Sequence, residues 1–134
     1  MRVYVTARFK NAKENRIETE KLCAAVESAG MVDFNFIRDI ENYEKTFDTP
    51  KDLWNAALKE LERCDALLVD VSDSPSGGRV IEVGMAYALR KPIFVVLKKG
   101  VHLKEFYRGV ANLVIEYEEI EEITRPLKEY SSDH

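Results

Sequence analysis

Residues 64–97 read CDALLVDVSDSPSGGRVIEVGMAYALRKPIFVVL, and the pattern of this stretch predicts the fold class. Ala66 to Val69 is a continuous apolar run followed by Asp70, a pattern typical of a strand that is covered on both faces and ends in a carboxylate. The segment Ser72 to Gly78 is rich in Ser, Gly and Pro and predicts a loop that leads into a helix. Ile93 to Leu97 is a second apolar run of strand length. A strand, a helix and a strand in this order predict a parallel sheet.

Glu82 is the only charged side chain between Arg79 and Arg90, in a helical segment that is otherwise apolar or weakly polar on every face. A carboxylate among apolar neighbours loses hydration, and an ionised one costs free energy unless something compensates. The candidates are the free N–H groups at the helix start, the helix dipole and a bound ligand with hydroxyl or cationic character. The alternative is a surface position, with Glu82 facing solvent or paired with Arg79. Glu82 is the first place to look for chemistry.

Strands and helices alternate along the whole chain. The predicted strands are Arg2–Thr6, Met31–Ile37, Ala66–Val69, Ile93–Leu97 and Leu113–Tyr117. The predicted helices run from about Ala12 to Gly30, from Thr49-Pro50 onward with Trp54 in the core, from Gly78 to Leu89 and from Glu118 to Tyr130, and a loop or short helix covers Val101–Gly109. We therefore predict an α/β fold, a flavodoxin- or Rossmann-like three-layer sandwich with a five-stranded parallel sheet, in a single domain over residues 1–134.

Three predicted loops follow the carboxyl ends of strands and converge on one edge of that sheet. They begin near Tyr4–Arg8, at Asp70 and at Lys98, and ligands of open parallel sheets bind at this edge. Tyr4 and Arg8 are therefore candidates for substrate binding. The polar segment Arg38–Pro50 shows no clear period and is either a functional lid or an ordinary surface excursion.

Composition limits the classes of partner. The net charge is −4 and the pI about 5.3, so a nucleic-acid backbone is not expected as a partner, although a single nucleotide is possible. Cys23 and Cys64 lie in apolar surroundings without metal-ligand spacing, which predicts small core residues in a reducing compartment. The chain starts directly with a strand, and no apolar run approaches the length of a membrane span. We expect a cytoplasmic protein without a membrane partner.

Known catalytic motifs are absent from the central loop. The GxxxxGK[ST] and GxGxxG patterns do not occur, there is no GxSxG, and the only histidines are His102 and His134. No His, Cys and Asp cluster indicates a metal, and no cofactor is expected. Carboxylate chemistry remains, with Glu82 and Asp70 as candidate catalytic residues. Ser76, Gly77 and Gly78 would form a backbone nest for an anion or hydroxyls at a helix N-terminus.

These residues resemble the nucleoside 2-deoxyribosyltransferase family, and within it the branch of 2′-deoxynucleoside 5′-phosphate N-hydrolases. The residues that carry the resemblance, at the spacing typical of the family, are Asp65, Ser76, Gly78, Glu82, Gly84, Ala86, Ala88, Lys91 and Pro92. Outside this stretch, Tyr4 matches a tyrosine of the family's first strand. Arg108-Gly109 and Asn112 resemble the segment that reaches the site of a neighbouring subunit.

The resemblance implies that Glu82 attacks C1′ of a deoxyribose and forms a covalent glycosyl-enzyme intermediate. Ser76 distinguishes the branches, because the transferases typically have Asp at this position and the nucleotide hydrolases have Ser. An Asp would repel a 5′-phosphate, whereas a Ser hydroxyl and the amides of Gly77 and Gly78 can donate to it.

The chain departs from the family pattern at two positions. Ala57 stands where the family usually has an Asp that helps to protonate or orient the departing base, so Asp70 would have to act as the acid or the base would be weakly activated. Lys104 stands where the hydrolases place a phosphate-binding Ser from the partner chain, and a lysine can bind phosphate as a point charge.

Three functions follow as hypotheses. The first is cleavage of the N-glycosidic bond of a deoxynucleoside 5′-monophosphate, and the second is a nucleoside deoxyribosyltransferase that exchanges bases. The third, suggested by Ala57, is a nucleotide-binding or sensor module without turnover. The helix from Gly78 to Leu89 is apolar on more sides than one sheet can cover, so we also expect a homodimer or a higher homo-oligomer.

Overall fold

One parallel sheet organises the chain, for which the computed structural model describes residues 1–8, 12–44, 47–73 and 76–134. Its strand order is β2-β1-β3-β4-β5. The strands are β1 (Arg2–Thr6), β2 (Val32–Phe34), β3 (Ala66–Asp70), β4 (Ile93–Lys98) and β5 (Leu113–Tyr117). The helices are α1 (Ala12–Ser28), α2 (Phe36–Asp39), α3 (Pro50–Arg63), α4 (Gly77–Ala88), α5 (Glu105–Val110), the 3-10 helix η1 (Ile120–Ile123) and α6 (Thr124–Asp133).

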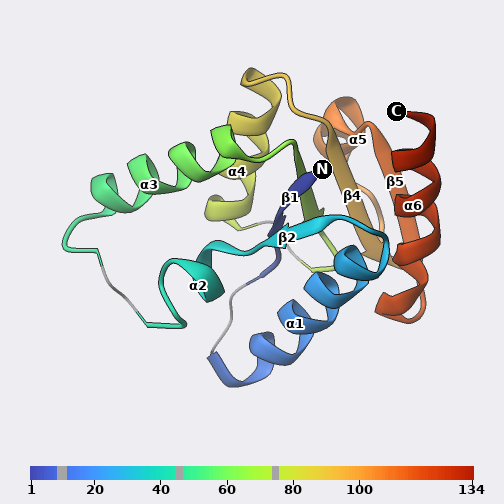
Figure 1. Cartoon of the computed structure of the whole chain (residues 1–134), viewed down its shortest axis with the longest axis horizontal. Helices are drawn as coiled ribbons and strands as arrows, with labels where there is room; N and C mark the ends of the chain where they lie inside the picture. Colours follow the sequence, from blue (N-terminus) through green and yellow to red (C-terminus); the bar gives the residue numbers. More distant parts are fainter. Residues whose placement is uncertain (9–11, 45–46, 74–75) are drawn as a thin grey trace.

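Helices cover both faces of the sheet, with α1 and α6 on one face and α3 and α4 on the other (Figure 1). Side chains of β1 alternate between the two layers, because Val3 and Val5 pack in the core with α1 while Tyr4 packs in the core with α3 and α4. All residues of β3 are buried, as expected of a strand covered on both faces. The predicted three-layer α/β sandwich with a five-stranded parallel sheet is confirmed.

The carboxyl ends of the central strands lie along one edge. Thr6 of β1 pairs with Val69 of β3, and Asp70 of β3 pairs with Val96 of β4. The segments that follow β1, β3 and β4 therefore emerge together, as predicted. Parts of the predicted loops, residues 9–11, 45–46 and 74–75, lie outside the described residues.

The prediction of a strand over residues 31–37 is wrong in its second half. Strand β2 ends at Phe34, and the next residue, Asn35, caps the short helix α2. The Oδ1 atom of Asn35 accepts a hydrogen bond of 2.9 Å from the backbone N–H of Arg38, while Nδ2 donates to the carbonyl of Val5 at 2.9 Å. A capping side chain favours a helix start over a continued strand.

The predicted closing helix over residues 118–130 is two helices. A capping box between Glu119 and Glu122 starts the 3-10 helix η1, and α6 begins only at Thr124. Pro126 lies in the first turn of α6, where a missing N–H is tolerated. The helix start predicted at Thr49-Pro50 is confirmed, since the hydroxyl of Thr49 accepts a hydrogen bond from the N–H of Asp52 at 3.1 Å.

Cys23 and Cys64 are buried free thiols, as predicted. Burial raises the pKa of Cys23 to about 12 and that of Cys64 to about 11. None of the helices in the described ranges combines the length and apolar character that crossing a bilayer requires.

Candidate active site

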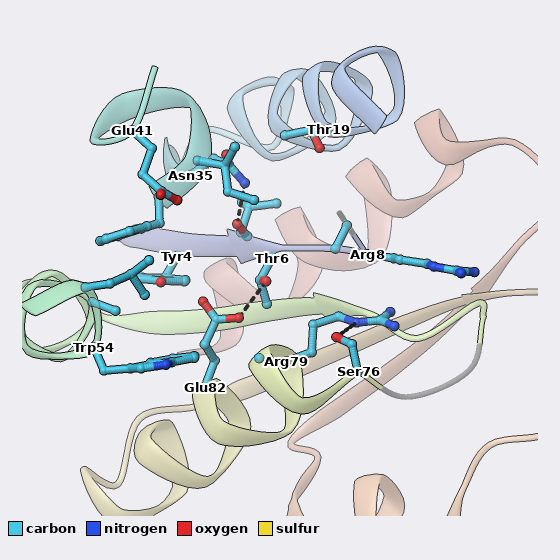
Figure 2. Close-up of a pocket in the computed structure, with 17 residues that line it drawn as sticks. Tyr4, Thr6, Arg8, Thr19, Asn35, Glu41, Trp54, Ser76, Arg79 and Glu82 are labelled. Carbon is cyan, nitrogen blue, oxygen red and sulfur yellow. Dashed lines mark hydrogen bonds between the residues drawn. The ribbon is translucent and has the colours of Figure 1, made fainter. Parts of the chain in front are cut away.

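A cavity of about 200 Å³ opens where β1, α2, α3 and the start of α4 meet (Figure 2). Five residues that the sequence analysis selected lie in its wall, namely Tyr4, Arg8, Ser76, Gly78 and Glu82. The cavity is also lined by polar and aromatic residues that the sequence did not single out as site residues: Thr6, Thr19, Asn35, Phe36, Glu41, Trp54 and Arg79. The carboxyl edge of the sheet therefore holds one polar pocket around Glu82.

Glu82 lies in the wall of this pocket and is only 9% exposed. Its Oε1 atom accepts a hydrogen bond of 2.8 Å from the hydroxyl of Thr6, which is also buried. Burial raises the pKa of the Glu82 carboxyl above its ordinary value, and the polar groups of Tyr4 and Thr6 and the charge of Arg79 oppose this rise. The alternative of a solvent-facing Glu82 is therefore wrong.

Tyr4 comes from the same face of β1 as Thr6, two residues earlier. Its ring packs against Phe34, with 5.3 Å between the ring centroids. Its hydroxyl is buried without a hydrogen-bond partner among the described residues. Burial and the nearby charge of Glu82 raise the pKa of Tyr4, so the phenol keeps its proton and can donate to a ligand.

Basic side chains gather at the end of the pocket where α4 begins. Arg79 is 2% exposed, and its guanidinium donates to the hydroxyl of Ser76 at 3.1 Å and to the backbone carbonyl of Asp70 at 2.7 Å. Its Nη1 atom also lies 2.7 Å from the carboxylate of Asp73. The exposed Arg8 approaches the other oxygen of Asp73 at 3.1 Å. Two guanidinium groups and the N-terminal end of a helix make this end suitable for an anion.

Aromatic side chains gather at the opposite end, beside α2 and α3. Trp54, which was predicted to lie in the core, is half-buried and forms part of the pocket wall. Phe36 is buried there, and Glu41 lines the same end (Figure 2). Ala57 is buried and faces the pocket from α3. A flat apolar group fits this end, and Glu82 lies between it and the basic end.

Asp70 and Gly77 do not line the pocket. The carboxylate of Asp70 accepts hydrogen bonds from the hydroxyl of Tyr117 at 2.5 Å and from the backbone N–H of Ser72 at 2.8 Å. Asp70 is thus directed toward β5, and only its backbone carbonyl contacts Arg79. Gly77 is exposed at the first position of α4, next to the pocket residue Gly78.

The three candidates from the C-terminal part of the chain also lie elsewhere. Lys104 lines a separate hollow with Asp73 and Tyr107. Arg108 is exposed on α5. Asn112 lies at the amino end of β5, where its side-chain carbonyl accepts the backbone N–H of Ile93 at 3.0 Å. The structure does not bring these residues to Glu82 within one chain.

Among the described residues, no group of three or more His, Cys, Asp or Glu side chains is placed to hold a metal ion.

Comparisons with known proteins agree with this picture of the fold. The model of the nucleoside 2-deoxyribosyltransferase family matches residues 3–120. The CMP N-glycosidase BcmB of Clostridium botulinum superposes with a TM-score of 0.69 and 23% identity, covering 97% of this chain and all of that one. The 2-deoxyribosyltransferase of Bacillus psychrosaccharolyticus gives a TM-score of 0.73 and 17% identity over 92% of this chain and 90% of that one.

The solution structure of BlsM gives a TM-score of 0.71 and 20% identity over 94% of this chain and 86% of that one. The search of curated proteins gave no match. The family match spans most of the chain and includes the strands, the loop and the helix that build the pocket. The chain therefore belongs to the nucleoside 2-deoxyribosyltransferase family and is an enzyme of N-glycosidic bond cleavage or transfer.

Proposed function

We propose that this enzyme hydrolyses the N-glycosidic bond of a 2′-deoxynucleoside 5′-monophosphate, with Glu82 as the nucleophile. The observation that carries this proposal is the buried Glu82 carboxyl, which lies between an aromatic end and a basic end of one pocket (Figure 2). A nucleotide has its groups in the same order, with a flat base, a sugar and a phosphate. With the base beside Trp54 and the phosphate beside Ser76, the anomeric carbon would face Glu82.

The reaction would proceed in two displacements. An oxygen of Glu82 attacks C1′, the bond from C1′ to the base nitrogen breaks, and its electron pair leaves with the base, which takes up a proton. Water then attacks C1′ of the glycosyl ester, which releases 2-deoxyribose 5-phosphate and the Glu82 carboxylate. Positive charge develops on the sugar in both transition states, so a nearby carboxylate with little solvent around it stabilises them.

The choice of a phosphorylated substrate rests on the basic end of the pocket. The hydroxyl of Ser76, the N–H groups at the start of α4 and the guanidinium of Arg8 are all donors suited to a phosphate. Asp73 forms ion pairs with both Arg8 and Arg79. When the phosphate binds, its oxygens would replace the Asp73 carboxylate as the partner of the Arg8 guanidinium. The name of the Clostridium botulinum neighbour, a CMP N-glycosidase, supports a nucleoside monophosphate as substrate.

A chromatographic assay of released base tests the substrate class. The deoxynucleoside monophosphates are compared with the matching nucleosides and with ribonucleotides such as CMP, each with and without a second free base. The proposal predicts base release from the deoxynucleoside monophosphates and none from the unphosphorylated nucleosides. Base exchange on nucleosides would instead identify a transferase, and saturable nucleotide binding without turnover would identify a binding module.

Two variants connect the activity to the pocket. Glu82→Gln keeps the shape of the side chain but removes the nucleophile, so base release should fall by roughly 10⁴-fold or more. Glu121→Gln changes an exposed carboxylate of η1 that does not line the pocket, and it should leave the rate of base release unchanged. Undiminished release by Glu82→Gln would overturn the role of Glu82.

A further inference from the structure

The proposed reaction needs a proton for the departing base, and the pocket holds a second carboxyl group that is suited to supply it. Glycosidic bond cleavage generally uses two carboxyl groups, one on the sugar and one on the leaving group. Among the described residues that line the pocket, Glu41 and Glu82 are the only acidic side chains. This inference rests on the proposed function and extends it to the leaving-group side of the reaction.

Glu41 lies at the end of the pocket where the base is expected. It follows α2, is half-buried, and shares this end with Trp54 and Phe36. Figure 2 shows Glu41 and Glu82 on opposite sides of Tyr4, each directed toward the pocket. Besides burial, the negative charges of both Glu82 and Glu41 raise the pKa of Tyr4, so both carboxyl groups lie within electrostatic reach of its hydroxyl. Two carboxyl groups thus line one pocket, one on either side of Tyr4.

Other acids of the described part of the chain are less suited to this role. The carboxylate of Asp70 is held by Tyr117 and Ser72 and lies outside the pocket wall. The hydroxyl of Tyr4 lies in the pocket, but its raised pKa makes it a weak proton donor. Ala57 faces the base end from α3 and carries no titratable group.

We propose that Glu41 is a catalytic residue that donates its proton to the base as the bond to C1′ breaks. The electron pair of that bond moves to the base nitrogen, and the Glu41 proton neutralises the base. In the second step the Glu41 carboxylate takes a proton from the water that attacks C1′, which restores the acid form. The net reaction consumes one nucleotide and one water and releases one base and one sugar phosphate.

Leaving-group dependence of the cleavage rate tests this role. Glu41→Gln is compared with wild type on a deoxynucleoside monophosphate and on the 4-nitrophenyl 2-deoxyriboside 5-phosphate, whose nitrophenolate departs without a proton. The variant should cleave the nucleotide about 10²–10⁴-fold more slowly and the nitrophenyl substrate at nearly the wild-type rate. Glu41→Asp, which keeps an acid, should retain more nucleotide cleavage than Glu41→Gln.

Glu44→Gln is the matched control, because Glu44 is an exposed carboxylate three residues along the same segment and outside the pocket wall. It should cleave both substrates at the wild-type rate. Equal losses of Glu41→Gln on both substrates, or no loss on either, would overturn the proposal for Glu41. A wild-type enzyme without activity on either substrate would instead overturn the proposed function.

Discussion

The carboxyl group of Glu82, the proposed nucleophile, is buried at a cost to the stability of the folded chain when it is ionised. Burial raises the pKa of Glu82, so the folded state holds the Glu82 proton more tightly than the unfolded chain does. The contribution of Glu82 to stability is therefore most favourable below the ordinary pKa of a glutamate. It is lost as pH rises from that value through the raised pKa of the folded state.

Glu82→Gln should therefore be more stable than wild type at neutral pH, because the neutral amide has no ionised form to desolvate. The difference should shrink at acidic pH, where Glu82 is protonated in both states. Urea unfolding followed by circular dichroism at several pH values measures both quantities. A variant that is less stable than wild type at neutral pH, or a difference that does not change with pH, would contradict this explanation.

At the scale of the elements, α2 and the residue before it shape the base end of the pocket. Asn35 is 4% exposed, caps α2 through its side-chain carbonyl and ties the chain to β1 through its amide. Glu41 lies two residues after the end of this helix. The position of Glu41, the proposed proton donor, therefore depends on the side chain of Asn35, which takes part in neither displacement.

Asn35→Ala should destabilise the fold by about 1–3 kcal/mol, because it leaves α2 uncapped and the carbonyl of Val5 without its partner. Asn35→Asp keeps the cap acceptor but sets a buried carboxylate oxygen against the carbonyl of Val5, so it should also destabilise the fold. Asn55→Ala, at an exposed asparagine in α3, should change stability by less than about 0.5 kcal/mol. Denaturant midpoints measure the series, and an Asn35→Ala midpoint equal to that of Asn55→Ala would refute the role of Asn35.

Periodicity predicted the elements better than it predicted the pocket. The strand and helix order followed from apolar runs, and Glu82 stood out because it is charged in an apolar helix. The place of Thr6 in the pocket could have been predicted from the sequence, since Thr6 lies two residues after Tyr4 on the same face of a strand. That of Glu41 could not, because its segment has no period. Its place in the pocket follows from α2, whose first half was predicted to be strand and whose second half was predicted to be loop.

Arg79 shows a second limit of sequence reasoning. Its place beside Glu82 in the helix suggested a surface pair, yet its guanidinium turns toward Asp70 and Asp73. One partner is a backbone carbonyl, which no residue pattern reveals. Trp54 lay on an apolar helical stripe and was predicted to be core for the same reason, although its ring closes one wall of the pocket.

At the scale of the whole molecule, α4 keeps an apolar face that no described part of the chain covers. Val80, Ile81 and Tyr87 are 41%, 48% and 61% exposed, and Phe106 of α5 is 51% exposed. Large exposed apolar side chains that follow one helix suit a contact with a second copy. We propose a homodimer through this face, in which Lys104, Arg108 or Asn112 of one copy approaches the pocket of the other.

Ile81→Glu should convert the dimer into a monomer and lower base release, because the partner's contribution to the pocket is lost with the interface. Sedimentation velocity and the base-release assay measure the two effects on the same sample. Ile17→Glu is the matched control, since Ile17 is a 62% exposed isoleucine on α1, which packs on the other face of the sheet. A wild-type monomer that is fully active, or a dimer that survives Ile81→Glu, would contradict the proposed interface.

The central claim is a covalent bond between Glu82 and the sugar, and mass spectrometry of the intact protein tests it most directly. A 2′-fluoro-arabino nucleotide slows both displacements, because fluorine opposes the positive charge at C1′ and a slow second step lets the ester accumulate. We predict one sugar phosphate adduct per chain, located on Glu82 by peptide mapping, with one base released per adduct and none in Glu82→Gln. Release of base from the analogue without any adduct, or an adduct on another residue, would contradict the mechanism.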